Sequence, residues 1–330
     1  MNTFRAFMID KVNDEIQADI KTLAMDELPD GEVTIRVHYS SVNFKDGLAT
    51  LRNGGVIRNY PMVGGIDLAG TVIASQHTDF KEGDEVIVTG YDLGVNHFGG
   101  YSEIARVPAS WVVPLPEGLT LKEAMVVGTA GFTAALSIQR LEDNGVKQEK
   151  GPILVTGATG GVGSSAVSFL KQLGYTVIAS TRKVDAREFL QSIGAAEIIS
   201  PEEITNPKNK ALLKQQWQAA VDSVGGKYLP VILASIQYGG SVALSGLTGG
   251  NRFESTVYPF ILRGVNLLGI DSVFCPMDVR QKVWKRIASE MKSTTYFETA
   301  VQEITLDQLP ETLKTILQGE LRGRTIVRLT

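Results

Sequence analysis

Short runs of β-forming, apolar residues alternate with helical patterns through the middle of the chain, from about residue 123 to residue 297. Strands that alternate with helices in this way predict an α/β domain built on a parallel, doubly wound sheet. The predicted strands are Pro152–Thr156, Tyr175–Ser180, Ala196–Ser200, Ala219–Ser223, Ser241–Ser245 and Val265–Asp271. The predicted helices include Ser164–Leu173, Asp185–Ile193, Lys210–Trp217 and Lys227–Gln237.

The segments on either side follow a different pattern. Residues 1–122 contain alternating polar and apolar positions, as in Glu32–Tyr39, and are punctuated by glycine and proline, which predicts an antiparallel β domain. The last segment, 298–330, predicts a short helix at Leu306–Gln318 and a strand at Thr325–Leu329. We expect it to return to the first domain, so that 1–122 and 298–330 form one discontinuous domain around 123–297.

Composition narrows the possible classes of protein. The chain has 330 residues, 43% of them hydrophobic, and a net charge of −4, which disfavours partners such as nucleic acid or a membrane surface that select basic patches. Its start lacks the pattern of a signal peptide, and no apolar run reaches the roughly 18 residues of a membrane span. The single cysteine, Cys275, excludes an internal disulfide. We therefore expect a cytoplasmic enzyme.

A glycine turn follows the first predicted strand of the middle domain. Gly160, Gly161 and Gly163 let backbone N–H groups approach a pyrophosphate, which then rests on the N-terminus of the following helix. Thr159 and Val162 belong to the same turn, and Gly174 ends the helix. Glycine clusters are common in loops, but the strand–turn–helix–strand context predicts a dinucleotide site.

The residues at the end of the second predicted strand determine which nucleotide the site prefers. An NAD site normally has a carboxylate here, which accepts hydrogen bonds from the ribose 2′-hydroxyl. This chain has Ser180, Thr181, Arg182 and Lys183, whose hydroxyls and cations suit a 2′-phosphate. A solvated basic start to the helix Asp185–Ile193 is the alternative, but the pattern favours NADPH.

Four stretches of the sequence carry a resemblance that covers essentially the whole chain. They are Ser40–Asp46, Gly64–Val72, Gly128–Ala134 and the glycine turn. Together they resemble the medium-chain dehydrogenase/reductase superfamily, and within it the quinone oxidoreductase family close to its acrylyl-CoA reductase branch. The resemblance implies a GroES-like β domain, a Rossmann domain, and a homodimer formed by pairing the sixth strands of two Rossmann sheets.

The resemblance also implies that no metal is bound. Zinc enzymes of similar fold have a cysteine where this chain has Asn43 and a His–Glu pair where it has Ile66 and Asp67. A catalytic zinc needs three ligands from cysteine, histidine or carboxylate, and an amide and an isoleucine cannot replace a thiolate and an imidazole. The three histidines lack metal-binding spacing.

The motifs give a set of candidate site residues. Asn43 is expected to donate a hydrogen bond to the reacting substrate, and Lys45 and Asp46 to orient it or pair with each other. Phe44 is expected to form a wall for the nicotinamide ring, with packing in the β domain as the alternative. Further cofactor contacts are implied by likeness and by strand-end position, and they are Thr129, Thr133, Leu247, Ile270, Ser272 and Arg324.

The missing metal limits the implied reaction. Without a Lewis acid, the acceptor must already be electron-poor: a quinone, an enone or an unsaturated thioester. The resemblance to the acrylyl-CoA reductase branch implies a short enoyl-CoA such as acryloyl-CoA. The nearest cations for the anionic CoA moiety are Arg52, Arg58 and Arg263, and solvated surface charge is the alternative explanation for each of them. A strict quinone or enone reductase and a non-catalytic NADPH-binding protein remain as alternatives. A short-chain dehydrogenase is excluded because no tyrosine has a lysine four residues later.

Overall fold

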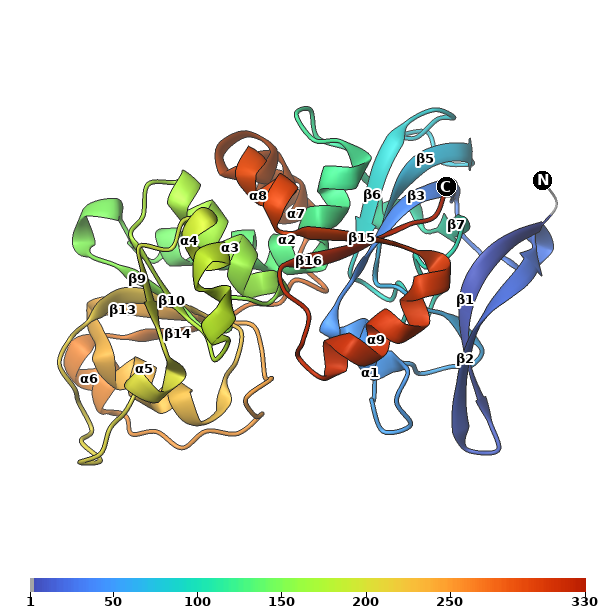
Figure 1. Ribbon diagram of the computed structural model, residues 1–330. Coiled ribbons are helices and arrows are strands. Elements are labelled where there is room, and N and C mark those ends of the chain that lie inside the picture. Colours follow the sequence, from blue (N-terminus) through green and yellow to red (C-terminus); the bar gives the residue numbers. More distant parts are fainter. Residues whose placement is uncertain (1–2) are drawn as a thin grey trace. The chain divides into compact units, whose positions relative to one another are not determined.

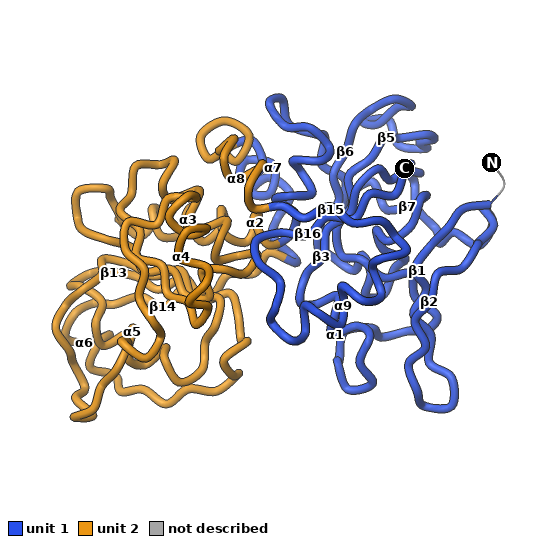
Figure 2. Tube along the Cα trace, in the orientation of Figure 1, with its two compact units in different colours: residues 1–129, 273–285, 301–330 blue, residues 130–272, 286–300 orange. Residues whose placement is uncertain are grey.

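The computed structural model describes residues 3–330 and divides into two compact units. Unit 1 takes the chain up to Thr129, then Val273–Lys285 and Val301–Thr330, and unit 2 takes Ala130–Ser272 and Arg286–Ala300 (Figure 2). The chain therefore leaves unit 2 after Ser272 and comes back to it at Arg286. Each unit is described here by itself.

Unit 1 is built on two sheets (Figure 1). The larger sheet has the order β15-β16-β3-β5-β6-β8, with β7 also paired to β3, and the smaller has the order β2-β1-β4. All pairs are antiparallel except β15 with β16, which confirms the predicted antiparallel domain. The strands are β1 (Thr3–Val12), β2 (Glu15–Ala24), β3 (Val33–Val42), β4 (Met62–Val63), β5 (Asp67–Ser75), β6 (Glu85–Thr89), β7 (Ile104–Val107), β8 (Val113–Pro114), β15 (Val301–Thr305) and β16 (Arg324–Arg328).

The C-terminal segment returns to the first sheet, as the sequence predicts. β16 pairs with β3 in the register Thr325 to Val42 and Arg328 to Tyr39. The predicted helix is present as the 3-10 turn η8 (Leu306–Gln308) followed by α9 (Leu309–Leu317), whose Leu309 and Leu313 are buried in the core of unit 1. The other helices that lie wholly or mainly in unit 1 are η1 (Met25–Glu27), α1 (Phe44–Ala49), η2 (Ala109–Trp111) and α7 (Met277–Arg286).

The two units divide the chain differently from the predicted segments 1–122 with 298–330 and 123–297. Val273–Lys285 packs in unit 1 because the buried Arg280 donates to the carbonyl oxygens of Thr89 and Val273. The guanidinium of Arg280 also lies 4.6 Å from the centre of the Tyr91 ring. No sequence pattern predicts that this segment belongs to unit 1, because the contacts that hold it join residues far apart in the chain.

Unit 2 is a six-stranded, all-parallel sheet with the order β11-β10-β9-β12-β13-β14, and this doubly wound Rossmann arrangement confirms the predicted fold class. Its interior face is apolar, with Leu154, Ala220 and Val242 buried in one cluster. The strands are β9 (Ile153–Val155), β10 (Val177–Ser180), β11 (Glu197–Ile199), β12 (Trp217–Asp222), β13 (Ile236–Leu244) and β14 (Asn266–Gly269).

The helices of unit 2 include one correction. The predicted helix Lys210–Trp217 is wrong, because this segment is extended: Leu213 N and Gln216 N donate to the carbonyl oxygens of Ala234 and Ser235. The predicted helix Lys227–Gln237 forms only in part, since Ile236 already begins β13. The helices are η3 (Gln148–Lys150), α3 (Gly161–Gln172), η4 (Val184–Ala186), α4 (Arg187–Ser192), η5 (Pro201–Glu203), η6 (Gly226–Tyr228), α5 (Leu229–Ser235), α6 (Tyr258–Arg263), the π-helical turn η7 (Ile287–Met291) and α8 (Thr294–Thr299).

Helix α2 (Leu121–Asp143) passes from unit 1 to unit 2 and bends at Gly128, where φ is 50° and ψ is −160°. By length and composition it could cross a membrane, but 78% of its apolar window is buried inside the protein. Its apolar character is therefore that of a core helix.

Candidate functional site

The buried polar cluster of unit 1 is organised around the carboxylate of Asp67, the first residue of β5. One oxygen accepts hydrogen bonds from Ser41 Oγ at 2.5 Å, Asn43 Nδ2 at 2.8 Å and the backbone N of Thr129 at 2.9 Å, and the other accepts from Thr129 Oγ1 at 2.5 Å. The side chain of Asp67 is fully buried. Four donors compensate for the cost of burying this carboxylate. Because Thr129 lies at the bend of α2, Asp67 also supports the start of the helix beyond it.

The amide of Asn43 is held in one orientation by two opposite partners. Nδ2 donates to Asp67, and Oδ1 accepts from Nη1 and Nη2 of Arg324, each at 3.3 Å. A carboxylate requires a donor and a guanidinium requires an acceptor, so the assignment of the amide nitrogen and oxygen follows from the network. The second N–H of Asn43 has only long contacts, 3.4 and 3.5 Å to Ser41, and is the group that could donate to a substrate.

Asp46 stabilises the turn that presents Asn43. One of its oxygens accepts from the backbone N of Asn43 at 2.9 Å and the other from the backbone N of Ile66 at 3.0 Å. Burial and, after it, the nearby Asp67 raise the pKa of Asp46 to about 7, against the lowering effect of these two hydrogen bonds. Lys45 is the adjacent residue on α1 and is half-exposed, and neighbouring helix residues do not face each other. The geometry supports Asp46 as an orienting residue, and its predicted catalytic role and that of Lys45 stay predictions.

Arg324 and Phe44 complete the predicted residues of this cluster. Arg324 is 2% exposed, and its Nε donates to the carbonyl oxygen of Val126 at 2.9 Å. Its described hydrogen bonds all lie within unit 1, and its predicted contact with the cofactor stays a prediction. Phe44 is 36% exposed at the start of α1, so an apolar ring is accessible beside Asn43.

The donor set of this cluster does not suit zinc. The positions that the resemblance equates with metal ligands of zinc enzymes hold Asn43, Ile66 and Asp67, and the Asn43 amide is already bound between a carboxylate and a guanidinium. The guanidinium of Arg324 places a fixed positive charge 3.3 Å from Asn43 Oδ1, which would repel a divalent cation. Within residues 3–330, no group of three or more histidine, cysteine, aspartate or glutamate side chains could hold a metal ion.

The glycine turn of unit 2 lies between β9 and α3. Gly157 adopts φ of +56°, and a Cβ on Gly163 would lie 2.3 Å from the carbonyl oxygen of Gly157, so only glycine fits there. α3 begins at Gly161 after Gly160, which has no side chain to cap it. The first N–H groups of α3 are thus left for a ligand, and the positive end of the helix suits the predicted pyrophosphate.

Most of the other predicted cofactor residues of unit 2 follow the carboxyl ends of the strands in the same sheet, whereas Thr133 lies on α2. Thr159 Oγ1 lies 3.5 Å from Thr181 Oγ1, just beyond β10, and Lys183 N donates to that same hydroxyl. Arg182 is exposed, whereas Ser180 is buried. The described positions of the remaining members are Thr133 and Ser272, joined by a 2.8 Å hydrogen bond, Val162 in the first turn of α3, Leu247 after β13 and Ile270 after β14.

Two residues of the buried polar cluster in unit 1 were not predicted from the sequence. Asp67 and Ser41 were not singled out as site residues, although Asp67 stands at a position that the metal comparison had already marked. Asp222, at the end of β12, accepts hydrogen bonds from the backbone N atoms of Val224 and Gly225 and so caps a turn.

Two family descriptions match the chain, "Alcohol dehydrogenase GroES-like domain" at residues 29–117 and "Zinc-binding dehydrogenase" at residues 161–289. The Bacillus subtilis protein YhfP, named as a candidate quinone oxidoreductase, is 55% identical over 99% of both chains. The acrylyl-CoA reductase AcuI of Ruegeria pomeroyi is 47% identical over 98% of both chains.

Two solved structures are similar over the full chain. The B. subtilis YhfP structure, described with NAD bound, gives a TM-score of 0.97 at 55% identity and covers 100% of both chains. The YhdH oxidoreductase of Salmonella enterica, described in complex with NADP, gives a TM-score of 0.96 at 43% identity and covers 99% of this chain and all of its own. The chain therefore belongs to the medium-chain dehydrogenase/reductase superfamily, in its zinc-free, quinone oxidoreductase-like branch.

Proposed function

We propose that this protein is an NADPH-dependent, zinc-independent reductase that reduces the C=C bond of a short enoyl-CoA such as acryloyl-CoA. The observation that carries the proposal is the clamped amide of Asn43, which offers one N–H where zinc enzymes of this superfamily place a metal ligand. The 47% identity to an acrylyl-CoA reductase along nearly the whole chain supports the choice of acceptor.

The chemistry of the acceptor explains why one amide donor is useful. NADPH, when bound, supplies the hydride, and addition to the β-carbon of the thioester moves a pair of electrons onto its carbonyl oxygen. The Asn43 N–H would stabilise this enolate oxygen, and the α-carbon then takes a proton from water or from a cofactor hydroxyl. Asp67 and Arg324 would keep the amide from rotating as the charge develops.

The cofactor site fits the charge of NADPH. The glycine turn leaves the N-terminus of α3 uncapped for the pyrophosphate, and Thr181, Arg182 and Lys183 follow β10 without a carboxylate that would repel a 2′-phosphate. Two YhdH structures that are 43% identical to this chain are described with NADP or NADPH, although the YhfP structure is described with NAD. We propose NADPH because the cations that would bind its 2′-phosphate, Arg182 and Lys183, are present in this chain itself.

Replacing Arg182 and Lys183 together by alanine should abolish most of the preference for NADPH over NADH. Each charge-assisted contact to the 2′-phosphate contributes about 1.5–3 kcal/mol, so the unmodified protein should prefer NADPH by roughly ten- to a hundredfold. The ratio of kcat/KM for the two cofactors measures this. Equal kcat/KM values with the unmodified protein would contradict the assignment, and Arg187→Ala, on the exposed start of α4, is the matched control for loss of a surface cation.

The three arginines proposed to bind the anionic CoA moiety have different surroundings in the structure, and only one of them suits that role well. Arg263 donates to the backbone carbonyl oxygens of Leu213, Ala234 and Ile236, so it serves the structure of unit 2. Arg52 forms an ion pair with Asp14. Arg58 is exposed on the loop after α1 and is the best of the three for an anionic handle.

Steady-state kinetics with three acceptors tests the proposed function. Acryloyl-CoA should be reduced with the highest kcat/KM, and a free acrylate ester should lose kcat as well as affinity, because binding energy from the remote CoA would no longer promote the reaction. A benzoquinone should be the poorest of the three relative to acryloyl-CoA. If the quinone is faster by orders of magnitude, the protein is a quinone reductase in the strict sense, and if NADPH binds but no acceptor is reduced, it is a non-catalytic binding protein.

The proposed assembly is a cytoplasmic homodimer with no nucleic acid or membrane partner. β14 is an edge strand of the unit 2 sheet, and apolar residues on and just before α6 are exposed: Val257, Tyr258, Ile261 and Leu262. An open strand edge beside exposed apolar residues supports pairing with a second copy. Sedimentation velocity would test the stoichiometry, and a monomer would contradict it.

A further inference from the structure

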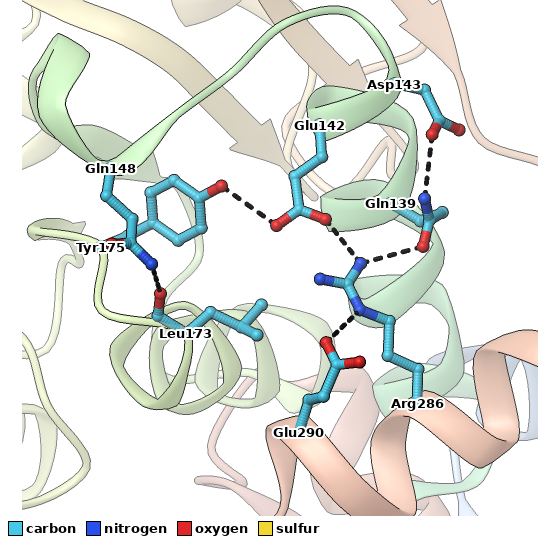
Figure 3. Close-up of polar contacts among 8 residues, drawn as sticks. All are labelled: Gln139, Glu142, Asp143, Gln148, Leu173, Tyr175, Arg286 and Glu290. Atoms are coloured by element: carbon cyan, nitrogen blue, oxygen red, sulfur yellow. Dashed lines mark hydrogen bonds and ion pairs between the residues drawn. The ribbon is translucent and has the colours of Figure 1, made fainter.

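The returning segment Arg286–Ala300 is fastened to unit 2 at two places. At its start, Arg286 donates to Glu142 at 2.5 Å, Gln139 at 2.9 Å and Glu290 at 2.8 Å, and Tyr175 donates to the other oxygen of Glu142 at 3.0 Å (Figure 3). This cluster lies at the C-terminal end of α2 and just after the end of α3. These hydrogen bonds anchor the start of the segment, but none of them involves a residue of the glycine turn.

The second fastening point is the hydroxyl of Tyr296, at the other end of α3. Tyr296 is fully buried on α8, its ring packs edge-on against Phe169, and its hydroxyl lies 2.8 Å from Ser165 Oγ and 3.1 Å from Ser164 Oγ. Ser164 and Ser165 are in the first turns of α3, the helix whose N-terminus we assign to the pyrophosphate.

The direction of these hydrogen bonds follows from the number of protons. Ser165 Oγ donates its one proton to the carbonyl oxygen of Gly161 at 2.8 Å, so it must accept from the Tyr296 hydroxyl. Ser164 Oγ lies 3.1 Å from the Tyr296 hydroxyl and 3.4 Å from the same Gly161 carbonyl oxygen. The shortest contacts therefore form a directed chain from Tyr296 to Ser165 to the Gly161 carbonyl.

The orientation of the Gly161 carbonyl determines the direction of a backbone N–H that we assign to the pyrophosphate. In a planar trans peptide, the C=O of Gly161 and the N–H of Val162 point in opposite directions. Holding the carbonyl toward Ser165 therefore aims the Val162 N–H out of the helix N-terminus, toward the position of the pyrophosphate. Gly160 and Gly161 have no side chains that could fix this peptide themselves, and no side chain caps the helix.

We propose that Tyr296 is a positioning residue for NADPH, which orients the Val162 N–H through Ser165 and the Gly161 carbonyl. This rests on the proposed cofactor site and assigns a role in it to a residue that comes about 130 residues later in the chain. Tyr296 does not touch the cofactor. Its contribution is to keep one donor of the glycine turn aligned in the free protein, so that less ordering is needed on binding.

The test compares two tyrosine-to-phenylalanine variants of the full chain. Tyr296→Phe should weaken NADPH binding about three- to tenfold, the loss expected for one hydrogen bond, as measured by fluorescence titration without acceptor. KM for NADPH should rise by the same factor while kcat stays unchanged. Tyr175→Phe removes a hydroxyl from the cluster beyond the other end of α3, so its dissociation constant should match the unmodified protein.

Two further variants keep the outcomes separate. Ser165→Ala should weaken NADPH binding as Tyr296→Phe does, and the double variant should be no weaker than either alone, because both break the same chain. Arg182→Ala reports on the cofactor site itself. If it weakens NADPH binding while Tyr296→Phe does not, or if Tyr175→Phe weakens binding as much as Tyr296→Phe, the positioning role is wrong. If Arg182→Ala also has no effect, the proposed cofactor site is wrong.

Discussion

Replacing Asn43 by alanine should lower kcat/KM for acryloyl-CoA by about 30- to 1000-fold, the effect of removing one oxyanion donor worth roughly 2–4 kcal/mol. The loss should fall mainly on kcat, because the enolate charge that the amide stabilises develops only as hydride is transferred. Removing the amide also leaves Asp67 and Arg324 facing each other across the vacated space, which adds a rearrangement of the buried cluster.

The experiment has a matched control in Asn59→Ala. Asn59 is exposed, and its amide bonds only to Asn96 among the described residues, so the same chemical change should leave the kinetics unaltered. Thermal unfolding of both variants separates a loss of structure from a loss of catalysis. An Asn43→Ala protein that unfolds normally and retains kcat within threefold would rule out the amide as the oxyanion donor.

Local signals in the sequence were enough for most of unit 2. Every predicted strand of its sheet is present within a few residues, because continuous β-branched runs and a glycine turn encode a buried parallel strand and its crossover locally. β13 is the exception in length, since it begins at Ile236 inside a predicted helix. Local propensity did not reveal that this residue would join the sheet.

The failed helix at Lys210–Trp217 has a tertiary cause. Leu213 has its N–H bound to the carbonyl oxygen of Ala234 and its own carbonyl bound to Arg263, so backbone groups that a helix would pair internally are satisfied by distant residues. A helical pattern in a short segment is a weak constraint when such partners exist. Arg263 is 50 positions from Leu213 in the sequence, and no local pattern indicates that the two residues are in contact.

The polar cluster of unit 1 was predictable in part. Asn43 and Asp46 belong to one short motif, and their contact follows from a helix cap. Asp67 is 24 positions from Asn43 and Arg324 is 281 positions away, so the clamp on the amide depends on the pairing of β3 with both β5 and β16. Such contacts are a consequence of sheet register, which no local pattern reports.

Gly128→Ala should both destabilise the protein and reduce its activity. Gly128 adopts φ of 50° and ψ of −160°, a backbone region that is essentially restricted to glycine, and a Cβ there would lie 2.5 Å from Ser41 Oγ and 2.8 Å from Asp67 Oδ2 and Arg324 Nη2. Strain and overpacking together should cost about 3–5 kcal/mol of stability.

The loss of activity should exceed what the lost stability explains, because the new methyl group would displace the carboxylate and guanidinium that hold Asn43. We expect kcat to fall more than tenfold at a temperature where the variant is still folded, as checked by circular dichroism. Gly319→Ala is the matched control: Gly319 has φ of +74° in the same unit, but a Cβ there meets nothing within 4 Å. It should cost only the strain of a left-handed alanine, about 1 kcal/mol, and leave kcat unchanged. If the two variants behave alike, the close packing of Gly128 against the cluster does not control the site, and the amide of Asn43 is held by its hydrogen bonds alone.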